Sequence, residues 1–277
     1  MDITGIMAKG QEIRKQAFII SYFAGGGHMG AAFSVADILA ALYFGDVMKY
    51  DAQNPGWEGR DFLILSKGHA AFALYAVLQM AGFIGREELK HVCRPGSKFG
   101  GHPKMREIPG VEASTGALGH GLSFGIGNAL ADKTDNKKNH TYIILGDGEC
   151  QEGSIWEGAL SAPSLGLGNL TVIVDHNKLQ AMDNLENIVK MQPFVDKWKA
   201  FGWNVTEVDG HNAGQLRDSL LIRCVDKPTL VIAHTIKGKG ISFMEGVPIW
   251  HYRMPDEKEL PIAMKELGIS KEELGII

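Results

Sequence analysis

The chain has 277 residues, 45% of them hydrophobic, and carries a net charge of −4. This length fits one large domain or two small ones, and the apolar fraction is ample for a packed core. Because no basic block stands out, we expect no nucleic-acid or membrane-surface role. No apolar run approaches the roughly 18 residues of a membrane span. The three cysteines, Cys93, Cys150 and Cys224, show no pairing or metal-type spacing, so we expect a reducing, cytoplasmic setting.

Helices dominate the first third of the chain. Apolar spacing predicts a helix over 6–23, and the glycines after it place His28 on a turn. Ser34, with Asp37 three residues later, predicts the start of a second helix over 35–44. A short buried strand is predicted at 61–65, and a helix that is apolar on all sides follows at 70–81.

Two stretches in the middle of the chain have unusual composition. Residues 97–109 are polar, Gly-rich and irregular, and long irregular stretches within compact domains are usually functional. Residues 118–133 predict a helix made largely of small residues. Each interior glycine costs roughly 1 kcal/mol relative to alanine. Such a helix makes sense only where another backbone or a ligand must approach closely.

A central strand–helix–strand unit holds the most informative polar residues. The strand at 142–145 runs into Gly146-Asp147-Gly148, a helix is predicted over 152–165, and the strand at 170–174 ends before Asn177. Open parallel sheets bind ligands at the carboxyl ends of their strands, so Asp147 and Asn177 should be neighbours. Carboxylate and amide oxygens suit Mg²⁺, or Ca²⁺ in its place. The two glycines allow backbone amides to approach a phosphate, which predicts a metal–diphosphate site.

The remaining elements continue the alternation of strands and helices. Strands are predicted at 203–208 and 229–234, with helices at 193–202, 215–225, 256–267 and 271–275, and an irregular polar stretch at 178–191. This pattern predicts an α/β fold with a parallel sheet flanked by helices, in one domain over residues 1–277.

Four of the ten histidines lie in separate loops, beside glycine or at strand ends: His28, His69, His102 and His251. A single histidine in a Gly-rich loop usually has no special role. An open sheet, however, can direct all four toward one rim, where imidazoles can hold hydroxyl groups and transfer protons near neutral pH.

Five blocks of sequence together resemble the transketolase family in order and spacing, over residues 10–255. They are the Gly-Asp-Gly turn closed by Asn177, Gly27-His28-Met29-Gly30, Leu65-Ser66-Lys67-Gly68-His69-Ala70, Gly101-His102-Pro103, and the run from Glu112 to Gly121. The turn alone is a weak signal, but five ordered blocks are a strong one.

The resemblance implies a thiamine diphosphate-binding fold and assigns roles to residues. Asp147, the Asn177 side chain and the Leu179 carbonyl would bind Mg²⁺. The four histidines would be the catalytic set that lines the substrate channel. Contacts to the cofactor are implied for His69, Gly116, Leu118, Gly146, Asp147, Gly148, Glu149, Asn177 and His251. Glu152 and Glu157 match glutamates near the subunit contact, although acidic residues in the first turn of a helix are also ordinary dipole partners. His120 is expected near the cofactor, without an assigned role.

The family's second half has no counterpart within this length. The pyrimidine-binding and C-terminal domains, which carry the glutamate that activates the cofactor, are therefore expected on a partner chain in an α2β2 heterotetramer. The resemblance implies the N-terminal subunit of a split transketolase, which moves a two-carbon ketol unit from a ketose to an aldose. Two alternatives stay open: a subunit of another thiamine enzyme, such as a deoxyxylulose-phosphate-type synthase or 2-keto acid decarboxylase, and a non-catalytic interaction protein.

Overall fold

The fold is built on a five-stranded sheet with the strand order β1-β2-β3-β5-β4. All four neighbouring pairs run parallel, as the alternation of strands and helices predicts. The computed structural model describes residues 1–181 and 183–276. The strands are β1 (Phe62–Leu65), β2 (Thr141–Gly146), β3 (Leu170–His176), β4 (Asn204–Asp209) and β5 (Thr229–His234).

Both faces of the sheet are covered, so the central strands β2 and β3 are apolar over most of their length. Along β2, Tyr142 and Ile144 enter one apolar core, whereas Ile143 and Leu145 enter the core on the other face. All six residues of β2 and all seven of β3 are buried. The alternation of side chains between two cores explains why these strands appear in the sequence as short apolar runs.

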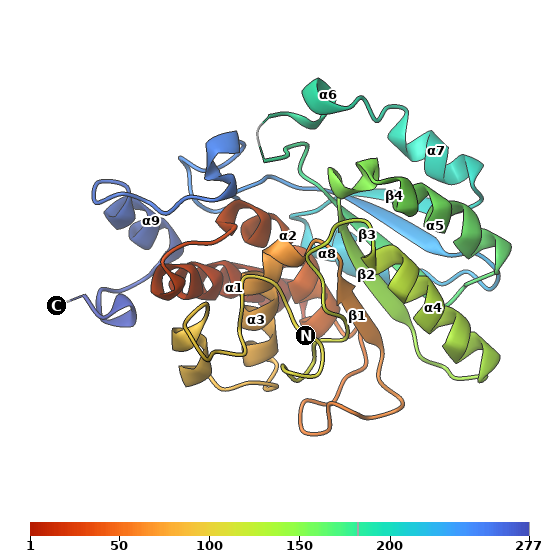
Figure 1. Ribbon diagram of the computed structural model, residues 1–277, viewed down its shortest axis with the longest axis horizontal. Coiled ribbons are helices and arrows are strands. Elements are labelled where there is room, and N and C mark those ends of the chain that lie inside the picture. Colours follow the sequence, from red (N-terminus) through yellow and green to blue (C-terminus); the bar gives the residue numbers. More distant parts are fainter. Residues whose placement is uncertain (182, 277) are drawn as a thin grey trace.

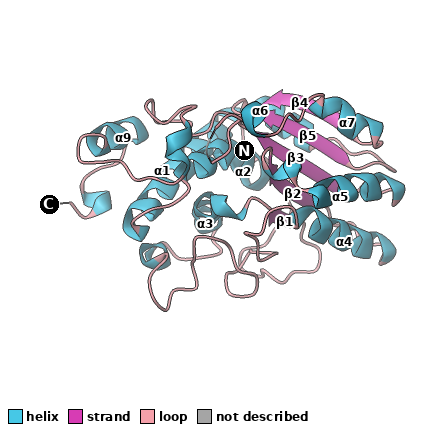
Figure 2. Cartoon of the chain, turned by 45° about the horizontal axis from the view of Figure 1, so that its top comes forward, coloured by secondary structure: helices cyan, strands magenta, loops and turns pink. Residues whose placement is uncertain are grey.

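The helices divide between the two cores. The first core includes α1, α2, α3 and α8, and the second includes α4, α5 and α7. Figure 1 shows α4 and α5 along the sheet, and Figure 2 shows α1 and α3 grouped away from them. The helices are α1 (Ile3–Ala24), α2 (Met29–Phe44), α3 (Ala71–Met80), α4 (Gly121–Thr134), α5 (Gly153–Ser164), α6 (Leu185–Ile188), α7 (Phe194–Ala200), α8 (Ala213–Leu220) and α9 (Leu260–Leu267).

The predicted start of the second helix was wrong. Helix α2 begins at Met29, with His28 in the position before it, so Ser34 and Asp37 lie inside the helix. Neither side chain caps the helix. The Ser34 hydroxyl donates to Asp175, and Asp37 accepts from Arg14. Both are buried polar groups that hold α2 against the sheet and against α1.

Further elements also differ from the sequence prediction, among them α9, which begins at Leu260 rather than at 256. Helix α4 begins at Gly121 rather than 118, because Gly119 has a φ of +82°, which a right-handed helix excludes. Helix α8 ends at Leu220, five residues before the predicted end. The short helix α6 lies in the stretch 178–191, where only irregular structure was expected. Met182 in that stretch lies outside the described residues.

The central unit matches its prediction. Strands β2 and β3 are parallel neighbours joined through α5, and Gly146 pairs in register with Asp175. The turn at 146–148 and the residues after β3 therefore meet at the carboxyl edge of the sheet. Within the described residues, no helix combines the length and apolarity needed to cross a membrane.

Candidate active site

A cavity of about 420 Å³ opens at the carboxyl edge of the sheet. Residues from the loops after β1, β2, β3 and β5 line it, together with the start of α2. Parallel sheets offer binding sites at this edge because several loops converge there. Of the residues expected from the sequence, the lining contains His28, His69, His102, His251, Gly116, Leu118, Gly146, Asp147, Gly148, Glu149, Glu152, Asn177 and Leu179.

The four predicted histidines come together at this cavity. The ring centroid of His28 lies 5.3 Å from that of His69, 6.2 Å from His102 and 4.9 Å from His251. The first precedes α2, the second lies in a short 3₁₀ turn after β1, and the last ends a 3₁₀ turn at Pro248–His251. The sequence prediction that these loops share one rim is confirmed.

The environment of the rings keeps most of them uncharged. Burial, the nearby His102 and two lysines lower the pKa of His28 to about 4. Burial and Lys237 lower the pKa of His251 to about 4. Burial, with Lys67 beside it, holds the pKa of His69 well below its usual value. These three are neutral imidazoles near pH 7, suited to hydrogen bonds with hydroxyl groups.

Two lysines that the sequence analysis did not single out also line the cavity. Lys67 is 1% exposed and forms an ion pair with Asp175, which also accepts from Ser34 and Thr235. Lys237 donates to the Gln180 carbonyl oxygen at 2.8 Å and contacts His251 Nδ1 at 3.0 Å. Burial and the charge of Lys67 lower the pKa of Lys237 to about 8.

Both lysines lie in Gly-rich runs directly after strands, and this was the signal available in the sequence. A cation at the carboxyl end of a parallel strand is well placed to meet an anionic ligand.

The turn after β2 orients its carboxylate through backbone amides. Asp147 is 2% exposed, and its oxygens accept from Gly148 N at 2.8 Å and from Lys178 N at 2.6 Å. The Asn177 side-chain oxygen accepts from Leu179 N at 3.0 Å. Asp147 thus bridges from the end of β2 to the segment after β3 that carries Asn177 and Leu179.

The donor set fits a hard cation. Asp147 offers carboxylate oxygens, Asn177 an amide oxygen and Leu179 a main-chain carbonyl, and all three line one cavity. Among the described residues, no group of three or more His, Cys, Asp or Glu side chains is placed to hold a metal ion. An oxygen-ligated ion such as Mg²⁺ would complete its shell with ligand and water oxygens.

The glycines of the cavity leave room that a side chain would fill. A Cβ at Gly148 would lie 2.8 Å from Gln180 Cγ. Gly116 has a φ of +147°, and a Cβ there would lie 3.0 Å from His102 Cδ2. Leu118, partly buried two residues on, supplies an apolar surface at the same wall. This wall suits a flat ring and the turn at 146–148 suits a phosphate group, so the residues present fit the expected cofactor.

Glu149 joins three segments around the cavity. One carboxylate oxygen accepts from the Ser66 hydroxyl and from Gly119 N at 2.9 Å, and the other accepts from Gly146 N at 3.1 Å. Ser66 in turn accepts from Gly121 N at 3.1 Å. The loop after β1, the turn after β2 and the start of α4 are thereby tied to one another.

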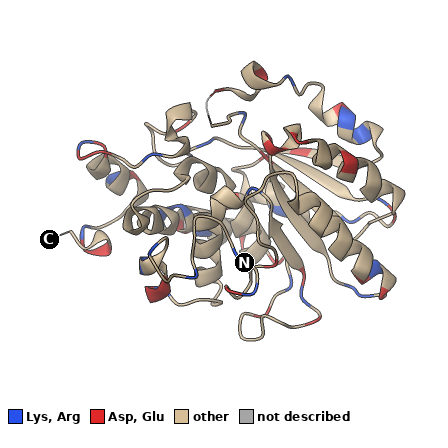
Figure 3. Ribbon diagram, in the orientation of Figure 1, with Lys and Arg blue, Asp and Glu red and all other residues tan. Residues whose placement is uncertain are grey.

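The two glutamates expected at a subunit contact lie on the outside of the chain. Glu152 immediately precedes α5, Glu157 lies within it, and both are exposed. Figure 3 shows acidic residues gathered at the start of α5 and along it. His120 is also exposed and is the residue before α4, with Nδ1 2.9 Å from the Leu118 carbonyl oxygen.

Comparison with known proteins places the chain among thiamine diphosphate-dependent sequences. The sequence model for the transketolase thiamine diphosphate-binding domain matches residues 11–276. The chain is 40% identical to one of the apulose-4-phosphate transketolase subunits of Phocaeicola vulgatus, over 99% of this chain and 98% of that protein. It is 42% identical to the 6-deoxy-6-sulfo-D-fructose transketolase subunit SqwG of a Clostridium species, over 88% of this chain and 89% of that protein.

The fold is similar to that of solved transketolases. The Campylobacter jejuni transketolase superposes with a TM-score of 0.90 at 29% identity, over 98% of this chain and 44% of that one. Human transketolase is 38% identical over 88% of this chain and 38% of its own length. The chain therefore spans nearly all of the subunit relatives but less than half of these longer transketolases.

Proposed function

This chain belongs to the transketolase family as an N-terminal, thiamine diphosphate-binding subunit, and from this premise we propose that it supplies one half of a two-chain active site. The observation that carries the proposal is the convergence of His28, His69, His102 and His251 on the cavity that Asp147 and Asn177 also line. The reaction class is transfer of a two-carbon ketol unit from a ketose to an aldose.

We assign the cofactor's diphosphate end to the turn at 146–148. In our proposal, Asp147, Asn177 and the Leu179 carbonyl bind Mg²⁺, which Ca²⁺ could replace, and Gly148 N donates to a phosphate oxygen. Lys237 adds positive charge at the same wall of the cavity. Gly116 and Leu118 pack against the rings. The bound cofactor supplies an electron sink for the carbon–carbon bond that is broken and remade.

The histidines act on the substrate's hydroxyl groups in this proposal. The pKa values of His28 and His251, both near 4, keep these two rings neutral, so each offers one N–H donor and one acceptor. Because Lys237 donates to His251 Nδ1, the proton of His251 lies on Nε2. Neutral rings bind a polyhydroxylated sugar without attracting unrelated anions, and they can take up a proton from a hydroxyl group and return it.

We propose that a second chain completes the site. The subunit names of the relatives imply such a partner. It would bring the pyrimidine-binding and C-terminal domains, including the glutamate that activates the cofactor, in an α2β2 assembly. Leu160, 56% exposed, lies on α5 together with Glu157, and Phe124, 52% exposed, lies on the neighbouring α4; these apolar side chains support a contact there.

The sugar class follows from the relatives, whose names specify a phosphorylated ketose in one case and a sulfonated ketose in another. We propose a ketose donor with an anionic group at its far end. The two lysines of the described cavity are already engaged, Lys67 with Asp175 and Lys237 with Gln180 and His251. We therefore propose that the partner chain binds the anionic group.

Affinity purification of the chain from its own cells, with thiamine diphosphate and Mg²⁺ present, tests the proposal. Native mass spectrometry should show a second chain of similar size in equal amount. That complex should then transfer a ketol unit between sugars and should not turn over pyruvate, which separates it from a keto acid decarboxylase or synthase.

Calorimetry with the complex tests the metal and cofactor assignment. Asp147→Ala should abolish binding of thiamine diphosphate in the presence of Mg²⁺. Asp135→Ala, at an exposed site just after α4, is the matched control and should bind as the unaltered chain does. Unchanged cofactor affinity in Asp147→Ala would refute the metal assignment.

A further inference from the structure

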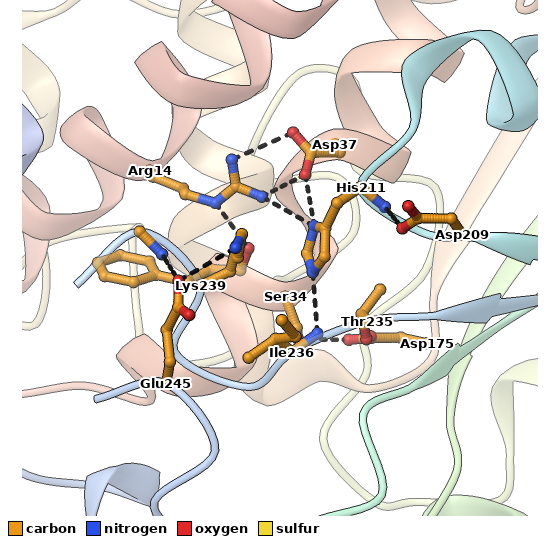
Figure 4. A network of polar contacts seen from close by, with 12 residues as sticks. Arg14, Ser34, Asp37, Asp175, Asp209, His211, Thr235, Ile236, Lys239 and Glu245 are labelled. Carbon is orange, nitrogen blue, oxygen red and sulfur yellow. Dashed lines mark hydrogen bonds and ion pairs between the residues drawn. The ribbon is translucent and has the colours of Figure 1, made fainter. Parts of the chain in front are cut away.

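A polar network lies away from the cavity, between α1, α2 and two loops (Figure 4). Arg14 of α1 pairs with Asp37 of α2, with Nη1 3.1 Å from Oδ1. His211, in the loop between β4 and α8, places Nδ1 2.7 Å from Asp37 Oδ2. Its other ring nitrogen, Nε2, accepts from Ile236 N at 2.8 Å. The network joins segments that are 23 to 197 residues apart in the chain.

The partners of His211 fix its tautomer. The Ile236 N–H group can only donate, so Nε2 must present its lone pair, and the ring proton lies on Nδ1. That proton is donated to Asp37. Burial raises the pKa of Asp37, but the hydrogen bond from His211 and the Arg14 guanidinium outweigh it and hold this pKa below its usual value. The ionised carboxylate therefore keeps His211 in the state that accepts from Ile236.

Ile236 is the residue before Lys237, and this short segment is held from both sides. Thr235 donates to the buried Asp175, and Gly238 N donates to the Gly30 carbonyl oxygen at 3.1 Å. Lys237 itself is 2% exposed and reaches into the cavity to His251. The backbone at 235–238 thus connects the network of His211 with the wall of the cavity.

We propose that His211 is a positioning residue: through its acceptor nitrogen it fixes the backbone at Ile236 and so holds Lys237 against His251. Its contribution to the reaction rests on the proposed function, whereas its effect on Lys237 does not. One histidine tautomer, set by Asp37 outside the cavity, then determines a second one inside it, because Lys237 directs the proton of His251 to Nε2.

Two amide substitutions separate this role from simple filling of space. His211→Gln can place an acceptor near the position of Nε2 and keep the bond from Ile236. His211→Asn is shorter, so it can keep a donor near Nδ1 for Asp37 but cannot reach Ile236. If His211 matters only as a partner for Asp37, Asn should be the better replacement; our proposal requires Gln to be better.

The readout is the titration midpoint of Lys237, followed by pH-dependent amine labelling and mass spectrometry of the full chain. The pKa of this group, about 8 in the native fold, should stay there in His211→Gln and rise toward 10.5 in His211→Asn as the ammonium gains solvent. Lys199, exposed on α7 and outside this network, is the internal reference for the labelling. Equal midpoints in the two variants, or a larger rise with Gln, would overturn the proposal.

Affinity for thiamine diphosphate with Mg²⁺ provides the second measurement. We expect roughly tenfold weaker binding in His211→Asn, the effect of about one hydrogen bond, and near-native binding in His211→Gln. If the unaltered chain binds no cofactor, the proposed function fails, while the Lys237 titration still decides the role of His211. Binding that is weakened alike in both variants would count against the role of the acceptor nitrogen.

Discussion

Glu149 shows how one buried residue can hold together the loops around the cavity. Burial raises the pKa of its carboxyl group above the usual value, and hydrogen bonds from three segments offset only part of this rise. The Ser66 hydroxyl and the N–H groups of Gly119 and Gly146 all donate to the two carboxylate oxygens. Since a carboxylate repels a diphosphate, we propose that Glu149 serves the cofactor by fixing these loops rather than by direct contact.

Glu149→Gln should therefore destabilise the chain and weaken cofactor binding. The new amide group would turn an N–H toward at least one of the three donors and leave that donor unpaired. The cost is about 1–3 kcal/mol of unfolding free energy. Urea unfolding measures this cost, and calorimetry with thiamine diphosphate and Mg²⁺ measures the binding. Glu257→Gln, at an exposed position, is the control and should stay within about 0.5 kcal/mol. If Glu149→Gln unfolds at the same urea concentration as the unaltered chain, this carboxylate does not hold the loops together.

Single residues differ in how far the sequence could foretell them. The histidines of the cavity follow short motifs in loops at one edge of the sheet, so their convergence could be predicted. His211 and Asp37 could not be assigned, because their roles depend on partners 174 residues apart in the chain. Lys67 and Lys237 are an intermediate case. Their positions beside glycines after strands can be seen in the sequence, but the sequence alone does not distinguish them from surface lysines.

Among the elements, the packing of α4 explains why this helix is rich in small residues. A Cβ added at Gly125 would lie 2.2 Å from Ile143 Cδ1 of β2, and one at Gly121 would lie 2.3 Å from Ser66 Oγ. At Gly127, nothing lies within 4 Å of such a Cβ. The expected close approach of another backbone is found at Gly121, where Ser66 Cα would lie 2.9 Å from the added Cβ. At Gly125 the close neighbour is a side chain, and at Gly127 there is none.

Substitution of these glycines should give opposite signs within one helix. Gly125→Ala should lower the unfolding free energy by about 1–3 kcal/mol, since the added methyl group overpacks the contact with Ile143. Gly127→Ala should raise it by roughly 0.5–1 kcal/mol, because alanine restricts the unfolded chain and favours the helix. Denaturant unfolding of both variants is the measurement, and a shift in the same direction for both would contradict this account of α4.

The strands were the most predictable elements and the helix starts the least. Buried parallel strands appear as short apolar runs, and each strand of the sheet matches its predicted range to within a residue or two at either end without any tertiary information. The start of α2 was predicted wrongly because Ser34 resembles a helix cap in its local sequence, whereas its hydroxyl donates to Asp175, 141 residues away. The short helix α6 has no local signal, and Leu185, its buried residue, is held by packing in the second core.

At the scale of the whole molecule, imidazoles kept neutral by burial make the fold sensitive to mild acid. Besides the rings of the cavity, His140 is buried at the opposite edge of the sheet, beside Thr171, and burial lowers its pKa to about 3. In the unfolded chain, histidines titrate near about 6.5. At pH values between about 6.5 and the lowered pKa values of the native chain, the unfolded state binds more protons than the native state. The unfolding free energy therefore falls as the pH falls.

The urea midpoint should accordingly be nearly constant between about pH 7 and pH 8 and should fall steadily from about pH 6.5 toward pH 4. Above pH 8 it should rise, because the pKa of Lys237 is lowered to about 8 in the native fold. The carboxyl groups with lowered pKa values, Asp37 and Asp175, titrate below their usual 3.8 and so act only under stronger acid. His140→Gln tests the origin of the slope, because glutamine can keep a bond to Thr171 without a titrating ring. It should flatten part of the decline while cofactor affinity at pH 7 stays native, since His140 lies far from the cavity. A midpoint unchanged between pH 7 and pH 5 in the native chain would mean that these rings are not held neutral, and with them the neutral state assigned to His28 and His251 would have to be abandoned.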